Sequence, residues 1–241
     1  MPDNIRIGEI TGLGNGARVN LLRSDSVPAP ESFLSGPELE KLAALKIEKR
    51  RRDWLGGRYA AKTLLKGSFV PEMPLSAMEI SYDPLGRPVL KSGGENSRLI
   101  SITHSGPFCA AAAGPDGTTF LGIDLEKAEP RDAAWYQDYF YKSELAAAAG
   151  GIEGSETRDE RRTTSREPLA TIRWTQKEAL LKALGLGLKA DLLDINLTGG
   201  APEFSRTALK RYEDLGKPPF ALATRALGDD PAAVWFLSVV S

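Results

Sequence analysis

The distribution of apolar positions predicts an alternation of helices and strands along the chain. Behind Pro37, a helical stripe begins with Leu39, Leu42 and Leu45 and runs on to Gly67. Other stretches combine strand-forming residues with turn residues and predict sheet structure. The segments in which strands are expected are 18–22, 76–90 (strand, turn and strand), 99–103, 120–125, 194–197, 220–224 and 234–240.

Some parts of this pattern allow more than one interpretation. Gly56 and Gly57 lie inside the first helical stripe, where glycine costs helix stability. They indicate either a close approach by another backbone or a ligand, or a break between two helices. The apolar run 108–113 fits a buried strand or a short helix. The polar, charged segment 150–168 predicts a loop or an insertion.

Two further helices are expected. The first covers residues 132–149 and presents aromatic side chains, and the second covers Trp174 to Leu188. Gly185 and Gly187 are expected to end this last helix, because glycine readily takes the left-handed conformation at a helix C-terminus.

The last helix carries the first candidate chemistry. Trp174, Glu178 and Lys182 are four residues apart and therefore lie along one helix face. A carboxylate and a lysine one turn apart can clamp a metal ion and a phosphate. The same spacing also fits an exposed ion pair that contributes little to stability.

Composition narrows the class of protein. The 241 residues are enough for one large domain or two small ones, and the apolar and charged fractions, 41% and 26%, are those of an ordinary globular protein. A net charge of −1 gives no general attraction to nucleic acid or to a membrane surface. The chain has no apolar run long enough to span a membrane and no signal-peptide pattern at its start. The single cysteine, Cys109, excludes an intramolecular disulfide and fits a reducing cytoplasm.

The histidine count restricts the metal chemistry. His104 is the only histidine, and together with one cysteine it excludes a zinc site built from several such ligands. A metal would have to be held mainly by carboxylates, which favours Mg²⁺ or a similar hard cation. In the strand GIDLE, Asp124 and Glu126 share one face, with Cα atoms about 6.5–7 Å apart, and can chelate one such ion.

Basic residues are crowded between Lys46 and Lys66. Most of them are interpreted as a solvated helix face. Arg52 and Arg58 flank the glycine pair and are better candidates for an anion site, and Arg87 follows the turn at Gly86.

Five stretches occur together in a distinctive order. At these residues the chain resembles the Sfp-type 4′-phosphopantetheinyl transferases, over roughly positions 45 to 200. The pairing of G-[IV]-D-x-E with W-x-x-K-E-A-x-x-K about fifty residues later carries most of the resemblance. The matching stretches are RRDWLGGR (51–58), GRP (86–88), SITHSG (101–106), GIDLE (122–126) and WTQKEALLKALGLGL (174–188).

The resemblance implies an activity and a set of site residues. The family moves the phosphopantetheine arm of coenzyme A onto a serine of an acyl or peptidyl carrier protein and releases adenosine 3′,5′-bisphosphate. By resemblance, Asp124, Glu126 and Glu178 hold Mg²⁺, with Mn²⁺ as an alternative. Glu178 is also the general base, acting directly or through water, and Lys182 meets the pyrophosphate.

The resemblance also implies how coenzyme A is bound. His104 occupies the position of the family histidine that contacts a coenzyme A phosphate, although a lone histidine can also be a satisfied core residue. Thr103 stands where the family usually has serine and keeps the hydroxyl. Arg52, Arg58 and Arg87 are expected to bind the 3′-phosphate and flank the adenine.

The family fold is α+β, with two similar halves in a pseudo-twofold arrangement and coenzyme A between them. It implies an N-terminal, coenzyme A-binding half over 1–118 and a C-terminal half with the metal and the catalytic helix over 119–241. It also implies a monomer. Docking of the acidic carrier protein is expected on the segment 135–145, through Tyr139, Phe140 and Lys142, and on the loop near 150–168.

Two alternatives use the same residues. A non-catalytic module could bind a nucleotide or another phosphate ligand, although it would have no need of three carboxylates. A nucleic-acid-binding protein could be built on the segment 46–66, but the net charge and the lack of an aromatic stacking platform weigh against it.

Overall fold

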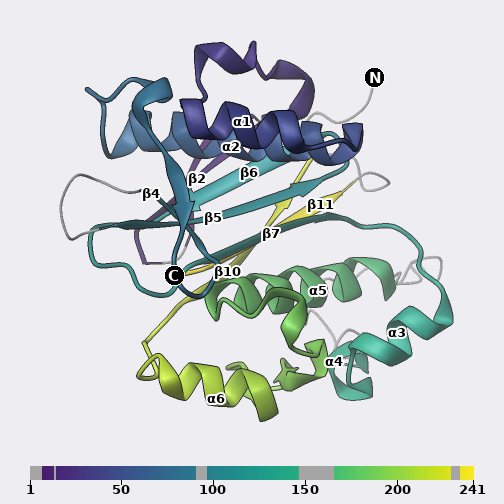
Figure 1. Cartoon of the computed structure of the whole chain (residues 1–241). Coiled ribbons are helices and arrows are strands. Elements are labelled where there is room, and N and C mark those ends of the chain that lie inside the picture. Colours follow the sequence, from purple (N-terminus) through teal and green to yellow (C-terminus); the bar gives the residue numbers. More distant parts are fainter. Residues whose placement is uncertain (1–6, 14, 91–96, 147–165, 229–233) are drawn as a thin grey trace.

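The computed structural model describes residues 7–13, 15–90, 97–146, 166–228 and 234–241. Their strands form two antiparallel sheets and a short two-stranded pair (Figure 1). The first sheet has the order β1-β2-β6-β5-β4-β3, the second has the order β10-β11-β7, and β8 pairs with β9. The strand bounds are β1 Gly8–Leu13, β2 Ala17–Arg23, β3 Ile80–Tyr82, β4 Pro88–Leu90, β5 Arg98–Ser105, β6 Phe108–Ala113, β7 Gly122–Lys127, β8 Ile195–Asn196, β9 Glu203–Phe204, β10 Leu222–Leu227 and β11 Trp235–Val240.

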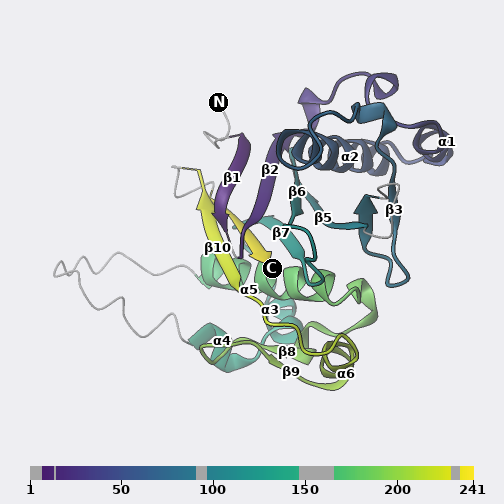
Figure 2. The ribbon, with the colours of Figure 1, turned by 90° about the vertical axis from the view of Figure 1, so that its left-hand side faces the viewer.

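The helices cover the outer faces of the sheets. In Figures 1 and 2, α1 and α2 lie on one side of the molecule, and α5 lies between the second sheet and a layer of shorter elements. Both long helices pack on sheets: α2 contacts β2, β5 and β6, and α5 contacts β7 and β11. The helix bounds are α1 Gly36–Ala44, α2 Glu48–Ser68, α3 Ala133–Tyr139, α4 Lys142–Ala146, α5 Arg166–Ala183 and α6 Arg206–Asp214.

The α+β class expected from the sequence is confirmed by this arrangement of helices and sheets. One long helix on an antiparallel sheet occurs twice along the chain, first as α2 and then as α5. The functional division into residues 1–118 and 119–241 stays a prediction.

Apolar side chains fill the space between the two sheets. Strand alternation places one face of β2 and β6 against one face of β7 and β11, and the buried residues of these faces form one cluster. Burial on this scale is the main source of stability in such a fold. The members that join the sheets include Val19, Leu21, Ala110, Ala112, Ile123, Leu125, Leu237 and Val239.

The first helical stripe is two helices and not one. It is interrupted at residues 45–47, where Leu45 and Ile47 take extended backbone conformations, and α2 then runs without a break through the glycine pair. The break predicted as one alternative at Gly56 and Gly57 is therefore wrong. Instead, the glycines let α2 approach the sheet: a Cβ on Gly57 would lie 2.6 Å from Cγ2 of Ile102.

The segment 132–149 also differs from the expected single helix. Within the described residues it forms α3 and α4, because Phe140 takes an extended backbone conformation between them. Residues 150–165 of the expected loop lie outside the described residues, whereas residues 166–168 already belong to α5. β1 and α6 had no predicted counterpart. None of the described helices is both long and apolar enough to cross a bilayer.

Candidate active site

The strand β5 presents two different sets of side chains, one on each face. Ser101, Thr103 and Ser105 point toward β7, whereas Ile102 and His104 line a pocket beside α2. β7 is an edge strand of the second sheet, and such an edge has unpaired backbone groups. The hydroxyls of β5 therefore meet groups on β7 that need hydrogen-bond partners.

Three hydrogen bonds join these strands. The hydroxyl of Ser101 accepts a bond from the backbone N–H of Ile123, at 3.0 Å. Thr103 donates to Oδ1 of Asp124, and Ser105 donates to Oε2 of Glu126, each at 2.9 Å. We call this set of three bonds the hydroxyl seam. It fixes both carboxylates of GIDLE to β5.

Asp124 is the centre of the polar cluster. Its side chain is nearly buried, and its Oδ1 accepts a second bond from Nζ of Lys182, at 2.6 Å. Lys182 also donates to the carbonyl of Ile123, at 3.0 Å. The other carboxylate oxygen of Asp124, Oδ2, is buried and has no hydrogen-bond partner among the described residues. Burial of a carboxylate oxygen without a hydrogen-bond donor costs folding free energy unless a bound ligand interacts with that oxygen.

The surroundings raise the pKa of the other two carboxylates. Burial, and then the charge of Asp124, raises the pKa of Glu126 from 4.5 to about 7. Burial also raises the pKa of Glu178, partly opposed by the Lys182 ammonium. A bound cation would favour the ionised form of both groups.

The carboxylate oxygens are the type of ligand that a hard cation prefers, but they do not form a complete coordination site. Within the described ranges, no group of three or more His, Cys, Asp or Glu side chains is placed to hold a metal ion. The orphaned Oδ2 of Asp124 is the observation that fits a cation, because it lies buried beside a second carboxylate on the same strand face. Lys182 already neutralises the other oxygen.

A close approach to β7 positions α5. α5 passes so near β7 that a Cβ on Gly122 would collide with the carbonyl oxygen of Ala179. The first glycine of GIDLE is therefore required by packing. At the other end, α5 ends at Ala183, and Gly185 follows with a φ of +65°, as expected for a residue that ends a helix. Gly187, with a φ of +50°, begins a short 3₁₀ helix, so the helix expected to reach Leu188 ends earlier than predicted.

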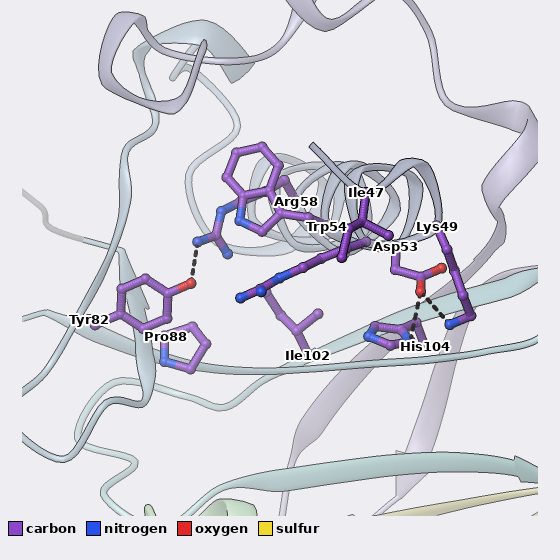
Figure 3. A pocket seen from close by; sticks show the side chains of 11 residues that line it. Ile47, Lys49, Asp53, Trp54, Arg58, Tyr82, Pro88, Ile102 and His104 are labelled. Atoms are coloured by element: carbon purple, nitrogen blue, oxygen red, sulfur yellow. Dashed lines mark hydrogen bonds and ion pairs between the residues drawn. The ribbon is translucent and has the colours of Figure 1, made fainter. Parts of the chain in front are cut away.

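A pocket of about 470 Å³ lies beside this cluster, between α2, β4 and β5 (Figure 3). Arg58 is almost fully buried there and donates to the Tyr82 hydroxyl at 2.9 Å. Its guanidinium carbon lies 5.0 Å from the Trp54 ring centroid and 5.5 Å from that of Tyr82. The lining residues are Ile47, Lys49, Arg50, Asp53, Trp54, Gly57, Arg58, Tyr82, Pro88, Ile102 and His104.

His104 lies in the wall of this pocket and not in the core. Its side chain is half-exposed, and Nδ1 lies 3.7 Å from Oδ2 of Asp53, which also accepts a bond from Lys49 at 2.8 Å (Figure 3). Burial lowers the pKa of His104, against the raising effect of Asp53. The imidazole is therefore mainly neutral at pH 7 unless an anion enters the pocket.

Two of the three predicted arginines lie outside this pocket. Arg52 is exposed and is not among the lining residues. Arg87 is engaged: its Nε donates to Asp83 at 2.8 Å, and Nη1 donates to the carbonyls of Thr119 and Ala183 at 2.8 and 3.2 Å. It lines a neighbouring cavity of about 440 Å³, together with Lys182.

Some pocket residues were not identified from the sequence. Arg50 and Trp54 line the pocket with Arg58. The three residues follow one another at intervals of four on α2 and therefore lie on one helix face. The same spacing argument that identified Glu178 and Lys182 could have found them. No comparable signal marks Tyr82, which comes from a different element.

The aromatic residues of the expected docking segment are largely internal. Phe140 is buried, and Tyr139 packs edge-on against Trp174, with ring centroids 5.1 Å apart. Phe140 is therefore unavailable to a partner, which corrects that part of the prediction. Trp174 belongs to this aromatic cluster, whereas Lys142 is exposed.

Comparisons with known proteins point to one family. The family model of the 4′-phosphopantetheinyl transferase superfamily matches residues 120–220. A holo-[acyl-carrier-protein] synthase of Staphylococcus carnosus is 30% identical over 98 residues, which cover 39% of this chain and 83% of that protein. A Synechocystis sp. protein with a provisional 4′-phosphopantetheinyl transferase name is 25% identical over 168 residues, or 69% of this chain. The match spans 63% of the Synechocystis protein.

Two solved structures are also similar. A holo-(acyl-carrier-protein) synthase from Bacillus anthracis, in complex with CoA (3′,5′-ADP), matches 44% of this chain and 100% of its own, at 21% identity and a TM-score of 0.37. A Thermotoga maritima holo-[acyl-carrier-protein] synthase matches 52% of this chain and 74% of its own, at 24% identity and a TM-score of 0.35.

Proposed function

The chain belongs to the 4′-phosphopantetheinyl transferase superfamily, and we propose that it transfers the 4′-phosphopantetheine group of coenzyme A to a serine of an apo acyl or peptidyl carrier protein. The observation that carries the proposal is the meeting of Asp124, Glu126 and Lys182 at the hydroxyl seam, with Glu178 one turn before Lys182 on α5. These groups provide acid–base and electrostatic functions in one place.

The reaction is a displacement at phosphorus. The serine oxygen attacks the phosphorus that carries the pantetheine arm and forms a new phosphodiester. The pyrophosphate P–O bond breaks, and adenosine 3′,5′-bisphosphate leaves. Glu178 accepts the serine proton, a role that suits a carboxylate whose pKa burial has raised. Lys182, already directed at Asp124, neutralises charge that develops on the leaving group.

Asp124, Glu126 and Glu178 would hold the divalent cation, for which Mg²⁺ is our first choice and Mn²⁺ the alternative. When bound, the cation supplies Lewis-acid polarisation of the pyrophosphate. Thr103 and Ser105 orient the two strand carboxylates through their hydroxyls. The unsatisfied Oδ2 of Asp124 supports this assignment.

The pocket beside α2 is our candidate for the nucleotide end of coenzyme A. Arg58, Lys49 and the neutral His104 offer donors to phosphate, and Trp54 and Tyr82 offer apolar ring faces. Phosphate contacts by Arg52 and Arg87 stay predictions, as does the action of the protein as a cytoplasmic monomer.

The decisive test is the intact mass of an apo acyl carrier protein after incubation with this protein, coenzyme A and Mg²⁺. We expect the carrier to gain one phosphopantetheine group, and the gain to disappear on chelation of the metal. Asp124→Ala and Glu178→Gln should abolish the gain. Lys182→Ala should weaken transition-state stabilisation by several kcal/mol at most.

Lys210→Ala, an exposed change on α6, is the matched control and should leave transfer intact. Wild-type turnover by Glu178→Gln would overturn the assignment of the base. Coenzyme A binding without transfer to any of several carriers would favour the alternative of a non-catalytic nucleotide-binding module.

A further inference from the structure

A second large cavity lies on the other side of α5 from the carboxylate cluster. It has a volume of about 600 Å³, within the range of small-molecule sites. The layer that contains α6, β8 and β9 covers α5 on that side (Figure 2). The cavity is lined by Arg173, Gln176, Leu197, Gly199, Gly200, Ala201, Pro202, Phe204, Tyr212, Pro219, Phe220 and Leu222. We call it the α5–α6 cavity.

The α5–α6 cavity is separate from the candidate active site. Arg173 and Gln176 lie roughly half a turn around α5 from Glu178 and Lys182, because each residue advances the helix by about 100°. None of the residues that line the pocket beside α2 also lines the α5–α6 cavity. A ligand there would leave the catalytic face of α5 free.

Arg173 is the one cationic side chain in the lining of this cavity. Its Nη1 donates to Oε1 of Gln176 at 3.1 Å, but its Nε is buried and has no hydrogen-bond partner among the described residues. No described carboxylate forms an ion pair with it. A guanidinium in a cavity wall without a carboxylate partner has an uncompensated charge, which favours binding of an anion.

A hydrogen-bond chain holds Arg173 in this orientation. Gln176, which accepts from Arg173, donates through Nε2 to Oγ1 of Thr224 at 3.0 Å. Thr224 in turn shares a hydrogen bond of 2.8 Å with Ser238, and Ser238 shares another of 2.8 Å with Thr175. The chain anchors the guanidinium to β10 and β11. The guanidinium is therefore held in the wall of the cavity in one orientation, which lowers the entropic cost of binding an anion there.

The opposite part of the cavity is apolar and aromatic. Phe204 and Tyr212 have ring centroids 4.7 Å apart, and Phe220 lies 6.0 Å from Tyr212. The Tyr212 hydroxyl already donates to the carbonyl of Pro218, at 3.0 Å, so the ring is fixed. A ligand thus meets a cation at one end and ring surfaces at the other.

We propose that the α5–α6 cavity binds a small carboxylate with a flat apolar body, such as an aromatic acid. The carboxylate pairs with the guanidinium of Arg173, the one cation in the lining, and the apolar body packs against Phe204, Tyr212 and Phe220. This binding is independent of phosphopantetheine transfer and of coenzyme A.

The test compares 4-methylbenzoate with its neutral isostere 4-methylbenzamide by isothermal titration calorimetry on the full chain. The wild-type protein is expected to prefer the carboxylate roughly ten- to hundredfold, the range of a charge-assisted hydrogen bond. Arg173→Met removes this preference. Lys210→Met, which removes an exposed cation on α6 outside the cavity, preserves it. Thermal midpoints establish that each variant is folded.

A second variant tests the location without touching Arg173. Gly200 has open space where a Cβ would stand, so Gly200→Leu can place a side chain in the cavity and should block both probes. Saturating coenzyme A should leave binding of 4-methylbenzoate unchanged. Equal affinity for the two probes, retained preference in Arg173→Met, displacement by coenzyme A or no binding to wild type would each overturn the proposal.

Discussion

The two long helices are each anchored by a fully buried lysine. In the first half of the chain, Lys62 of α2 pairs with Glu38 of α1, and in the second half Lys177 of α5 pairs with Glu144 of α4. Both ammonium groups also donate to backbone carbonyls, and burial lowers the pKa of both lysines. A buried ion pair thus ties each long helix to a shorter one.

The pairs differ in what else the glutamate holds. Glu144 accepts hydrogen bonds from the backbone N–H groups of Tyr141, at 2.8 Å, and Leu197, at 2.7 Å. Glu38 likewise accepts from the backbone N–H groups of Ser35, at 3.0 Å, and Ile80, at 3.4 Å. In addition it lies 3.5 Å from Nε of Arg58, the arginine in the proposed nucleotide pocket. The Lys177–Glu144 pair therefore stabilises only the fold of the second half. The Lys62–Glu38 pair stabilises the fold of the first half and also orients a ligand-binding group.

Breaking either pair should have the largest effect on stability. Lys177→Met leaves Glu144 buried without its counter-ion, and we expect it to cost about 3–5 kcal/mol of unfolding free energy. Lys62→Met should cost less, because Glu38 keeps Arg58 at 3.5 Å. Denaturant titration measures this cost, with the exposed Lys210→Met as control. The double change Lys177→Met with Glu144→Gln should recover part of the loss, because it removes the unpaired charge and keeps an acceptor for a backbone N–H group. A single change without cost would show that the pair contributes nothing.

The close-packed glycines of the two halves should differ in the cost of a methyl group. Gly122→Ala would strike the backbone of α5 and should cost about 3 kcal/mol or more, whereas Gly57→Ala meets only the Ile102 side chain and should cost about 1–3 kcal/mol. Gly67→Ala, in a part of α2 with open space, should stabilise by roughly 0.5–1 kcal/mol. Unfolding free energies in the reverse order would contradict this packing.

The glutamates of the two pairs should differ in their effect on ligand binding. Glu38→Gln frees Arg58 from its anchor and should weaken coenzyme A binding roughly tenfold, measured by calorimetry. Glu144→Gln is the matched variant and should leave the affinity unchanged. Equal losses in both would make the anchoring purely structural.

The smallest expected effect is a pair of opposite pH dependences in the metal-free protein. The pKa of Glu126 is raised in the folded state, from 4.5 to about 7. Its contribution to the unfolding free energy is therefore full below about pH 4.5 and is lost as pH rises through 7. The pKa of His104 is lowered from 6.5, so its contribution is present above pH 6.5 and is lost as pH falls through the folded-state pKa.

Thermal midpoints across this pH range separate the two groups. Relative to wild type, Glu126→Gln should gain most on the alkaline side, at about pH 8, and His104→Gln on the acid side, at about pH 5. Midpoint differences that do not change with pH would contradict both assignments.

Much of the candidate site could be predicted because its residues lie on regular elements. Strand alternation placed Asp124 and Glu126 on one face, and helical spacing placed Glu178 and Lys182 on another. Family membership, inferred from the combined stretches, is confirmed. The helical pattern failed at residues 45–47 and at Phe140, where extended backbone interrupts an otherwise continuous apolar stripe.

The buried lysine pairs could not be predicted, because pattern analysis treats lysine as an exposed residue. Lys62 belongs to the segment that was interpreted as a solvated face, yet it is fully buried. Its partner Glu38 is distant in sequence and on another helix. Tyr82 could not be predicted either, because its role depends on the position of Arg58 in the tertiary structure.

The hydroxyl seam also determines which sequence changes the two sheets can accommodate. Because strand side chains alternate, a shift of β5 by one residue would bring Ile102 and His104 to Asp124 and Glu126 and turn the hydroxyls toward α2. Exchange of serine for threonine keeps every bond, as Thr103 illustrates. A one-residue insertion or deletion in either strand would misalign all three bonds at once. Over evolutionary time this part of the chain can vary in the identity of its hydroxyl residues but not in its length.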